Sequence, residues 1–302
     1  MLITDEMRKQ FERQGYTIIK KVVPEKYCDR VVNATWEFLG HDPDDPDTWY
    51  EPPDGMDEYF SGSVGGMVEM YHHQSMWDTR QHPLVYQAFA ELLDEEELWV
   101  SIDRVNMTPP GREEFSELDN EFIHWDFDLS DVPDPRPVPN GVQGVLYLED
   151  TNANQGGFQC VPSIYEKIDE YRKNIPDDAD PYSPQEVVPD LDDHEIVKPE
   201  GEKGDLLIWD RLLAHGNGRN LADKPRLAQY ILMEPAKWGN VAERERRVES
   251  FQNQTVPMIN GESQFPGDPR EYEAEAFEQP TLTPLGRKLL GVDPWNGWLA
   301  NK

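Results

Sequence analysis

The sequence predicts a mainly β protein in which N-terminal helices pack against a sandwich or barrel of short strands. After about residue 98, short segments rich in β-branched and aromatic residues recur between Gly, Pro and Asn, a pattern typical of sandwiches and barrels. Before that point, apolar side chains recur at helical spacing. Hydrophobic residues make up 37% of the 302 residues, so a folded chain with a sizeable core is expected.

The N-terminal part, residues 1–97, is expected to be mainly helical. Its elements in order are a helix that Thr4 caps and Gly15 ends, a strand over residues 16–23, a helix from Pro24 to Gly40, and a helix from Pro83. We expect these helices to pack against the strands that follow.

Six strands are expected in the core, about residues 98–236. They are Trp99–Met107, Phe122–Phe127, Val142–Leu148, Gly157–Val161, Asp205–Trp209 and Leu227–Met233. A helical insert from Ser163 to about residue 174 interrupts the series. The C-terminal extension, about residues 237–302, is polar and rich in Pro, with one helical turn expected near Pro284–Leu290. Because no linker separates these parts, one domain over residues 1–302 is the simplest prediction.

The charge of the chain excludes some classes of partner. The sequence contains 60 Asp and Glu residues but only 28 Lys and Arg residues, which gives a formal net charge of −32. Such a surface repels phosphate backbones and anionic lipids, so neither nucleic acid nor a membrane is expected as a partner. The sequence has no stretch of 18 apolar residues and no N-terminal secretion signal, which predicts a soluble, cytoplasmic protein. Nothing in it indicates an oligomeric state.

Two short segments offer ligands for a metal. In residues 122–130 (FIHWDFDLS) an expected strand places His124 and Asp126 on one face. In so acidic a chain, about one such pair is expected by chance. In residues 204–220 (GDLLIWDRLLAHGNGRN), His215 lies between an apolar strand and a polar loop, an unusual place for core packing. Two His and one carboxylate leave three positions open on an octahedral ion, the facial triad of non-haem Fe(II) oxygenases.

Arg226 opens the strand that follows His215. Its guanidinium suits the far carboxylate of a dicarboxylate whose near end chelates the metal. The alternative for these four residues is ordinary: a surface His–Asp pair, an unrelated histidine and an ion-paired arginine. It is their order on successive expected strands that favours a metal site.

The same residues resemble the phytanoyl-CoA dioxygenase-like family of Fe(II)- and 2-oxoglutarate-dependent oxygenases. The family's His-x-Asp, Gly-Asp, distal His and Arg correspond to residues 124–126, residues 204–205, His215 and Arg226. The likeness extends over about residues 5–236. It departs at residues 162–165 (PSIY), where the family has Pro-Gly-Ser-His. Related halogenases replace the carboxylate with a small residue, so the presence of Asp126 disfavours halogenation.

The resemblance implies a double-stranded β-helix (jelly-roll, cupin-like) core with Fe(II) as catalytic centre on His124, Asp126 and His215. It also implies 2-oxoglutarate as co-substrate, held by Arg226, and O2 as oxidant. Asn217, Asn106 and Arg104 are further candidates for holding the co-substrate.

The implied reaction is hydroxylation of an unactivated C–H of a small metabolite, with release of succinate and CO2. Desaturation or ring formation at the same site, a non-catalytic jelly-roll binding module and a cupin-like metal enzyme that does not use 2-oxoglutarate remain alternatives. An aromatic segment before the core either lines the substrate pocket or packs internally. Its residues are Tyr71, His72, His73 and Trp77.

Overall fold

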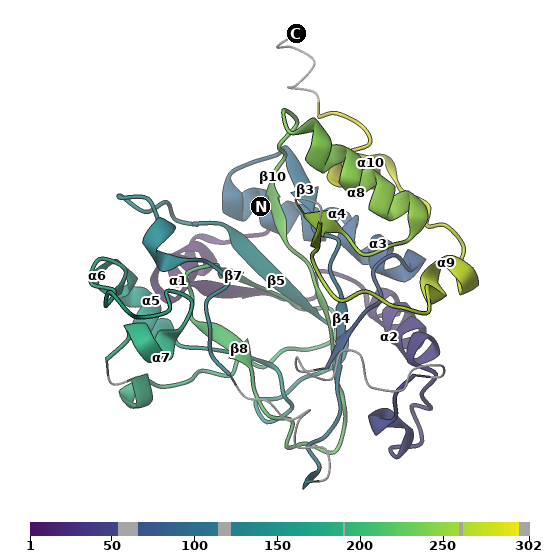
Figure 1. Ribbon diagram of the computed structural model, residues 1–302, viewed down its shortest axis with the longest axis horizontal. Helices are drawn as coiled ribbons and strands as arrows, with labels where there is room; N and C mark the ends of the chain where they lie inside the picture. The colour runs from purple at the N-terminus through teal and green to yellow at the C-terminus, as the bar shows by residue number, and fades with distance from the viewer. Residues whose placement is uncertain (54–65, 114–121, 190, 260–261, 296–302) are drawn as a thin grey trace.

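The main sheet of the protein is antiparallel, with the strand order β1-β7-β5-β9-β4-β2. A computed structural model describes residues 1–53, 66–113, 122–189, 191–259 and 262–295 (Figure 1). The strands of the main sheet are β1 (Tyr16–Ile19), β2 (Met67–Val68), β4 (Val105–Thr108), β5 (Val142–Tyr147), β7 (Leu206–Asp210) and β9 (Arg226–Tyr230). Neighbouring strands are mostly distant in sequence, as a jelly roll requires.

A smaller sheet completes the jelly roll. β6 (Phe158–Cys160) pairs antiparallel with β8 (His215–Asn217). Single bridges extend it on both sides, from Val197 to β6 and from His124 to β8. The double-stranded β-helix predicted from the sequence is therefore confirmed, with the site segments in its smaller sheet.

The two faces of the main sheet pack into two different hydrophobic clusters, because successive side chains of each strand point to opposite faces. On β7, Leu206 and Ile208 belong to the cluster beneath the helices, whereas Leu207 and Trp209 belong to the one inside the jelly roll. β5 alternates in the same way. Side chains of a strand point to opposite faces in turn, so both faces of this sheet are buried. The inner face is where a site enclosed by the jelly roll has to lie.

Helices cover the outer face and one end of the jelly roll. They are α1 (Asp5–Gln14), α2 (Glu25–Leu39), α3 (Gln74–Arg80), α4 (Pro83–Leu93), α5 (Pro162–Glu166), α6 (Ile168–Tyr171), α7 (Pro184–Val187), α8 (Val241–Asn253), α9 (Tyr272–Ala276) and α10 (Pro284–Leu290). Figure 1 shows α2, α3, α8, α9 and α10 on one side of the main sheet, and α5, α6 and α7 on the other. The expected caps are present: Thr4 accepts from the N–H of Met7, and Gly15 ends α1 at φ 79°.

Three expectations about the strands are wrong. Residues 122–127 form no strand; only His124 pairs, through its bridge to β8. The segment 99–107 is two strands, β3 (Leu98–Val100) and β4, because residues 101–104 leave the sheet between them. β3 pairs instead with β10 (Met233–Pro235). The first strand ends at Ile19, since Lys21 adopts a left-handed turn with φ 51°.

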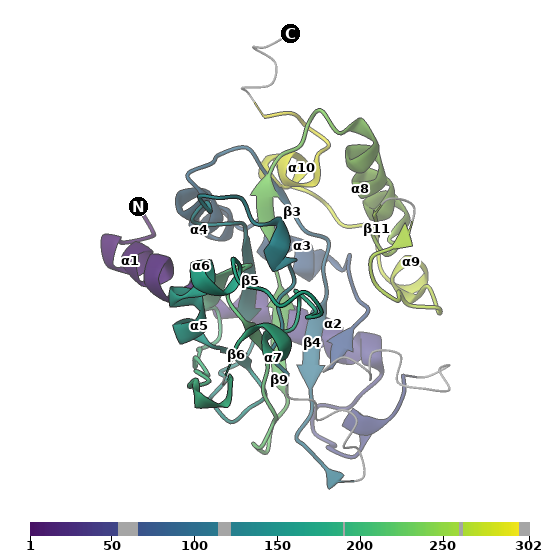
Figure 2. The ribbon, with the colours of Figure 1, turned by 60° about the vertical axis from the view of Figure 1, so that its left-hand side comes forward.

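The C-terminal extension is more ordered than the sequence suggested. It contains α8, α9 and a short hairpin, β11 (Met258–Ile259) with β12 (Glu262–Ser263), besides the expected helix α10. In α8 the helix buries Ser250 and Phe251 but has no continuous apolar stripe, so the periodicity was too weak to predict it. Arg247 fastens α8 to the core by donating to the carbonyls of Val100 and Leu290 (2.5 and 3.2 Å). Figure 2 shows α8 and α10 beside β3.

Candidate metal centre and co-substrate site

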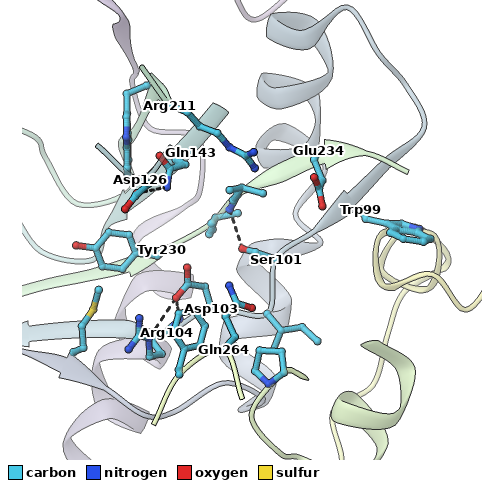
Figure 3. A pocket seen from close by; sticks show the side chains of 18 of the residues that line it. Trp99, Ser101, Asp103, Arg104, Asp126, Gln143, Arg211, Tyr230, Glu234 and Gln264 are labelled. Atoms are coloured by element: carbon cyan, nitrogen blue, oxygen red, sulfur yellow. Dashed lines mark hydrogen bonds and ion pairs between the residues drawn. The ribbon is translucent and has the colours of Figure 1, made fainter. Parts of the chain in front are cut away.

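A cavity of about 790 Å³ opens on the inner face of the main sheet (Figure 3). Its wall includes His124, Asp126 and His215 together with side chains of the main sheet and of α8. That volume is in the usual range for small-molecule sites. Among the described helices, none is long and apolar enough to cross a bilayer.

One ligand atom each of His124, Asp126 and His215 lies within 4.8 Å of the others. The backbone brings them together, because the N–H of His124 donates to the carbonyl of His215 (2.8 Å) and the N–H of His215 donates back (3.0 Å). The Nε2 atoms of His124 and His215 lie 2.9 and 3.4 Å from the two oxygens of Asp126. Trp125, between the first two, points the other way and donates from its indole to the carbonyl of Leu212 (3.0 Å).

The donor set fits a divalent metal. His215 Nδ1 lies 2.8 Å from the carbonyl of Leu213, so Nδ1 carries the proton and donates. In the neutral ring, Nε2 then offers a lone pair toward the carboxylate oxygen of Asp126. Two lone pairs that face each other repel unless a cation lies between them. Two imidazoles and one carboxylate, with the rest of the coordination sphere facing a cavity, are the donors that Fe(II) takes in non-haem oxygenases.

The position of Asp126 also favours its ionised form. Burial alone would raise its pKa, but when the facing imidazole nitrogens carry a proton in place of a metal, hydrogen bonds from His124 and His215 hold the pKa well below its usual range. Gln143, on β5, donates from Nε2 to Oδ2 of Asp126 (2.7 Å). This contact fixes the orientation of the carboxylate from outside the ligand set.

Arg226 and Asn106 lie side by side on the inner face of the main sheet. Both are fully buried, and Arg226 donates from Nη1 to Oδ1 of Asn106 (2.6 Å). Nε and Nη2 of Arg226 have no partner among the described residues. A buried guanidinium with free donors is costly, by about 1–3 kcal/mol for each unsatisfied group, so an anionic ligand or water is required there.

The other two co-substrate candidates both line the cavity, but differently. Asn217 ends β8 and accepts from the hydroxyl of Tyr230 (3.3 Å). Arg104 lies just before β4, is ion-paired with Glu69 (3.0 Å) and stacks on Phe265 with 3.6 Å to the ring centroid. Because its charge is already compensated, the geometry supports a wall residue more than a ligand for 2-oxoglutarate.

The aromatic segment lies away from the cavity. Tyr71, His72 and Trp77 are buried and His73 is half-buried, and none of them lines the cavity. His72 and Trp77 stack on each other and pack against Phe251 of α8. The prediction of substrate contact therefore stays a prediction: these residues lie behind the cavity wall, where Tyr71 stacks on the wall residue Phe265 and Trp77 packs against α8. Internal packing, the alternative, agrees with these contacts.

Several polar residues of the cavity were not predicted from the sequence, among them Gln143 and Arg211. Gln143 lies between the buried residues Val142 and Gly144 on β5, and Arg211 directly follows β7. A polar residue inside a buried strand was the available signal for Gln143. Nothing in the local sequence distinguishes Arg211 from a surface arginine.

Residues 11–228 match the family model described as phytanoyl-CoA dioxygenase (PhyH). The chain belongs to this family. A protein of Aspergillus versicolor, Ava biosynthesis cluster protein O, is 28% identical over 82% of this chain and 83% of its own length. A phytanoyl-CoA dioxygenase homologue of Dictyostelium discoideum is 24% identical over 94% of this chain and 86% of its own. The predicted enzyme class, a non-haem iron and 2-oxoglutarate-dependent oxygenase acting with O2 on small molecules, is confirmed at the level of the family.

Solved structures share the fold at low identity. The hypothetical protein JW0805 of Escherichia coli superposes with a TM-score of 0.66 and 17% identity, covering 95% of this chain and 82% of its own. The epimerase SnoN, solved with Fe3+, α-ketoglutarate and nogalamycin RO, gives a TM-score of 0.54 at 16% identity, covering 77% of this chain and 83% of its own. At these identities the likeness extends to the fold alone.

Proposed function

We propose that the protein binds Fe(II) through His124, Asp126 and His215 and hydroxylates an unactivated C–H of a small metabolite. The observation that carries this proposal is the convergence of the three ligand atoms, within 4.8 Å, in the wall of a cavity of about 790 Å³. When bound, the iron and 2-oxoglutarate supply the oxidation of a C–H bond by O2, with release of succinate and CO2.

The residues around the iron site have distinct tasks. Gln143 holds the carboxylate of Asp126, and the carbonyl of Leu213 holds the ring of His215, so the ligands are preorganised. The free donors of Arg226 are suited to a carboxylate of 2-oxoglutarate, with Asn106 fixing the guanidinium and Asn217 as a further polar contact. The apolar wall, including Trp209 and Phe158, excludes water from the reacting region.

Three other functions compete with hydroxylation. A binding module without activity would not need the preorganised ligand set. A cupin-like metal enzyme without 2-oxoglutarate would leave the buried donors of Arg226 without a purpose. Desaturation or ring formation would use the same residues and is distinguished only by its product.

The test is anaerobic titration with Fe(II) and 2-oxoglutarate, followed by measurement of succinate under O2. The wild type is expected to show a weak visible charge-transfer band and 2-oxoglutarate-dependent succinate release. His124→Ala and His215→Ala should lose both, whereas His194→Ala, which removes a histidine that does not line the cavity, should retain them. Full succinate release by either site variant, or no band in the wild type, would refute the iron assignment.

A further inference from the structure

Most of the cationic side chains in the cavity wall already have a partner. Five cationic side chains line it, and three of these have partners. Arg104 is paired with Glu69, Lys237 with Glu234 (2.9 Å), and Arg247 with backbone carbonyls. The remaining two, Arg211 and Arg246, have no side-chain hydrogen bond or ion pair among the described residues.

Arg211 projects into the cavity next to the candidate metal centre. It directly follows β7, and its backbone N–H donates to the carbonyl of Gly141 (3.2 Å), which anchors the residue at the end of the strand. Figure 3 shows its guanidinium reaching into the cavity between Gln143 and Glu234. The charge is therefore presented from a fixed strand end beside the residues that surround Asp126.

Arg246 approaches the same cavity from the C-terminal extension. It lies on α8, outside the residues 11–228 that match the family model. Its Nε is shielded from solvent and has no partner among the described residues. An unsatisfied donor on a charged group is unfavourable by about 1–3 kcal/mol, which a bound acceptor relieves.

We infer that the cavity binds a substrate with a carboxylate, which Arg211 and Arg246 hold while an apolar body lies against the aromatic wall. This inference rests on the proposed function, because the site has to admit the substrate beside iron and 2-oxoglutarate. The aromatic wall includes Trp99, Phe122, Phe158, Trp209 and Phe265.

Two cations of the cavity wall are available to an anionic substrate, because Arg211 and Arg246 have no partner among the described residues. Glu69 and Glu234 already compensate Arg104 and Lys237. Asp126, one of the four acidic side chains of the wall, belongs to the candidate ligand set of the metal. The −32 net charge of the chain does not prevent binding, since charges beyond about 8–10 Å are largely screened at physiological salt. Guanidinium groups bind carboxylates through paired hydrogen bonds, so a matched neutral amide should bind much less tightly.

The test is isothermal titration calorimetry on the anaerobic enzyme loaded with Fe(II) and 2-oxoglutarate. The probes are 3-phenylpropionate and octanoate, each compared with its primary amide. At least one acid should bind at one site, with its amide at least about tenfold weaker, which corresponds to about 1.4 kcal/mol. Arg211→Gln and Arg246→Gln should each weaken the acid about tenfold or more and leave the amide unchanged. Arg211→Lys, which keeps the charge, should retain part of the preference for the acid.

Arg13→Gln is the matched control, because Arg13 is an exposed arginine of α1 that does not line the cavity. Its acid affinity should equal that of the wild type, and thermal unfolding midpoints check that each variant is folded. The inference is overturned if neither acid binds, or if acid and amide bind equally. It is also overturned if both glutamine variants bind the acid like the wild type. Displacement of 2-oxoglutarate by the acid, seen as loss of the visible band, would overturn it as well. Absence of that band before any acid is added would instead refute the proposed function.

Discussion

Arg226 has five N–H donors in a fully buried position and uses Nη1 on Asn106. Its position at the start of β9 places it on the same face as Ala228, which packs inside the jelly roll. The sequence could predict this side, since alternation along a strand is regular. It could not predict Asn106 as the partner, because the two residues meet only when β4 pairs with β9.

At the residue scale we predict that Arg226→Lys weakens 2-oxoglutarate binding about 10- to 100-fold. Lysine keeps the charge but loses the planar fork that binds a carboxylate through two hydrogen bonds. The loss corresponds to about 1.4–2.8 kcal/mol. Anaerobic titration of the visible band measures the dissociation constant, with Arg13→Lys as the control. An unchanged constant would show that Arg226 does not hold the co-substrate.

At the element scale, β8 depends on a glycine. A Cβ added at Gly216 would lie 1.9 Å from the carbonyl oxygen of Phe122. Only glycine lets the segment before His124 approach β8 closely enough for the bridge between His124 and His215. This requirement is a property of the pairing between two distant segments and is invisible in either segment alone.

We therefore predict that Gly216→Ala pushes the His124 segment away from β8. Stability should fall by about 1–3 kcal/mol, as for other overpacked sites, and the affinity for Fe(II) should fall with it. Chemical denaturation and metal titration measure the two effects. Gly239→Ala is the control, because an added Cβ there would have no neighbour within 4 Å. Equal behaviour of the two variants would contradict the close approach.

A second element, α9, is attached to the core through a buried carboxylate. Burial raises the pKa of Glu273 to about 7, although the N–H groups of Tyr71 and His72 donate to it and lower it. The folded state therefore binds this proton more tightly than the unfolded state, whose glutamate has the usual value near 4.5. Stability from this group is complete below about pH 4.5 and is lost as the pH rises toward 7.

Glu273→Gln replaces the carboxyl group with an amide that does not titrate, so the variant lacks this pH-dependent contribution to stability. The stability of the wild type minus that of the variant should fall by about 1–3 kcal/mol between pH 4.5 and 7.5. Urea denaturation measures the free energy of unfolding of both proteins across this pH range. Contributions from the other titrating groups are the same in both proteins and cancel in the difference. A difference that stays constant, or rises, would contradict the raised pKa of Glu273.

At the scale of the whole molecule, one hydrophobic cluster joins the three parts of the chain. It includes Ile3 from the N-terminal part, Ile208 from the core and Leu290 from the C-terminal extension. The prediction of a single domain over residues 1–302 stays a prediction, and this shared cluster supports it. The extension also contributes Arg246 and Phe265 to the cavity wall, so fold and site depend on the same segment.

The net charge of −32 acts on the whole molecule at once. Self-repulsion opposes compact folding and is screened by salt, while exposed ion pairs contribute little. We predict that raising NaCl from about 0.05 to 0.5 M, where the Debye length shortens severalfold, increases the thermal unfolding midpoint by a few degrees. Differential scanning calorimetry measures the unfolding midpoint at each salt concentration, and an equal concentration of KCl is the control. A midpoint that falls with both salts would show that ion pairs outweigh repulsion.

The sequence by itself indicated a sandwich or barrel, because alternation and turn residues are local properties. It also contains His124, Asp126, His215 and Arg226 in the order that carried the resemblance to the family, and this resemblance implied the jelly roll. Tertiary structure alone decided that residues 122–127 bridge rather than form a strand, that Tyr71 to Trp77 pack away from the cavity, and that Arg211 and Arg246 share one cavity wall. The physical reason is the same in each case. Whether a polar side chain is paired, buried or free depends on which distant segment packs beside it, and spacing along the chain does not encode that partner.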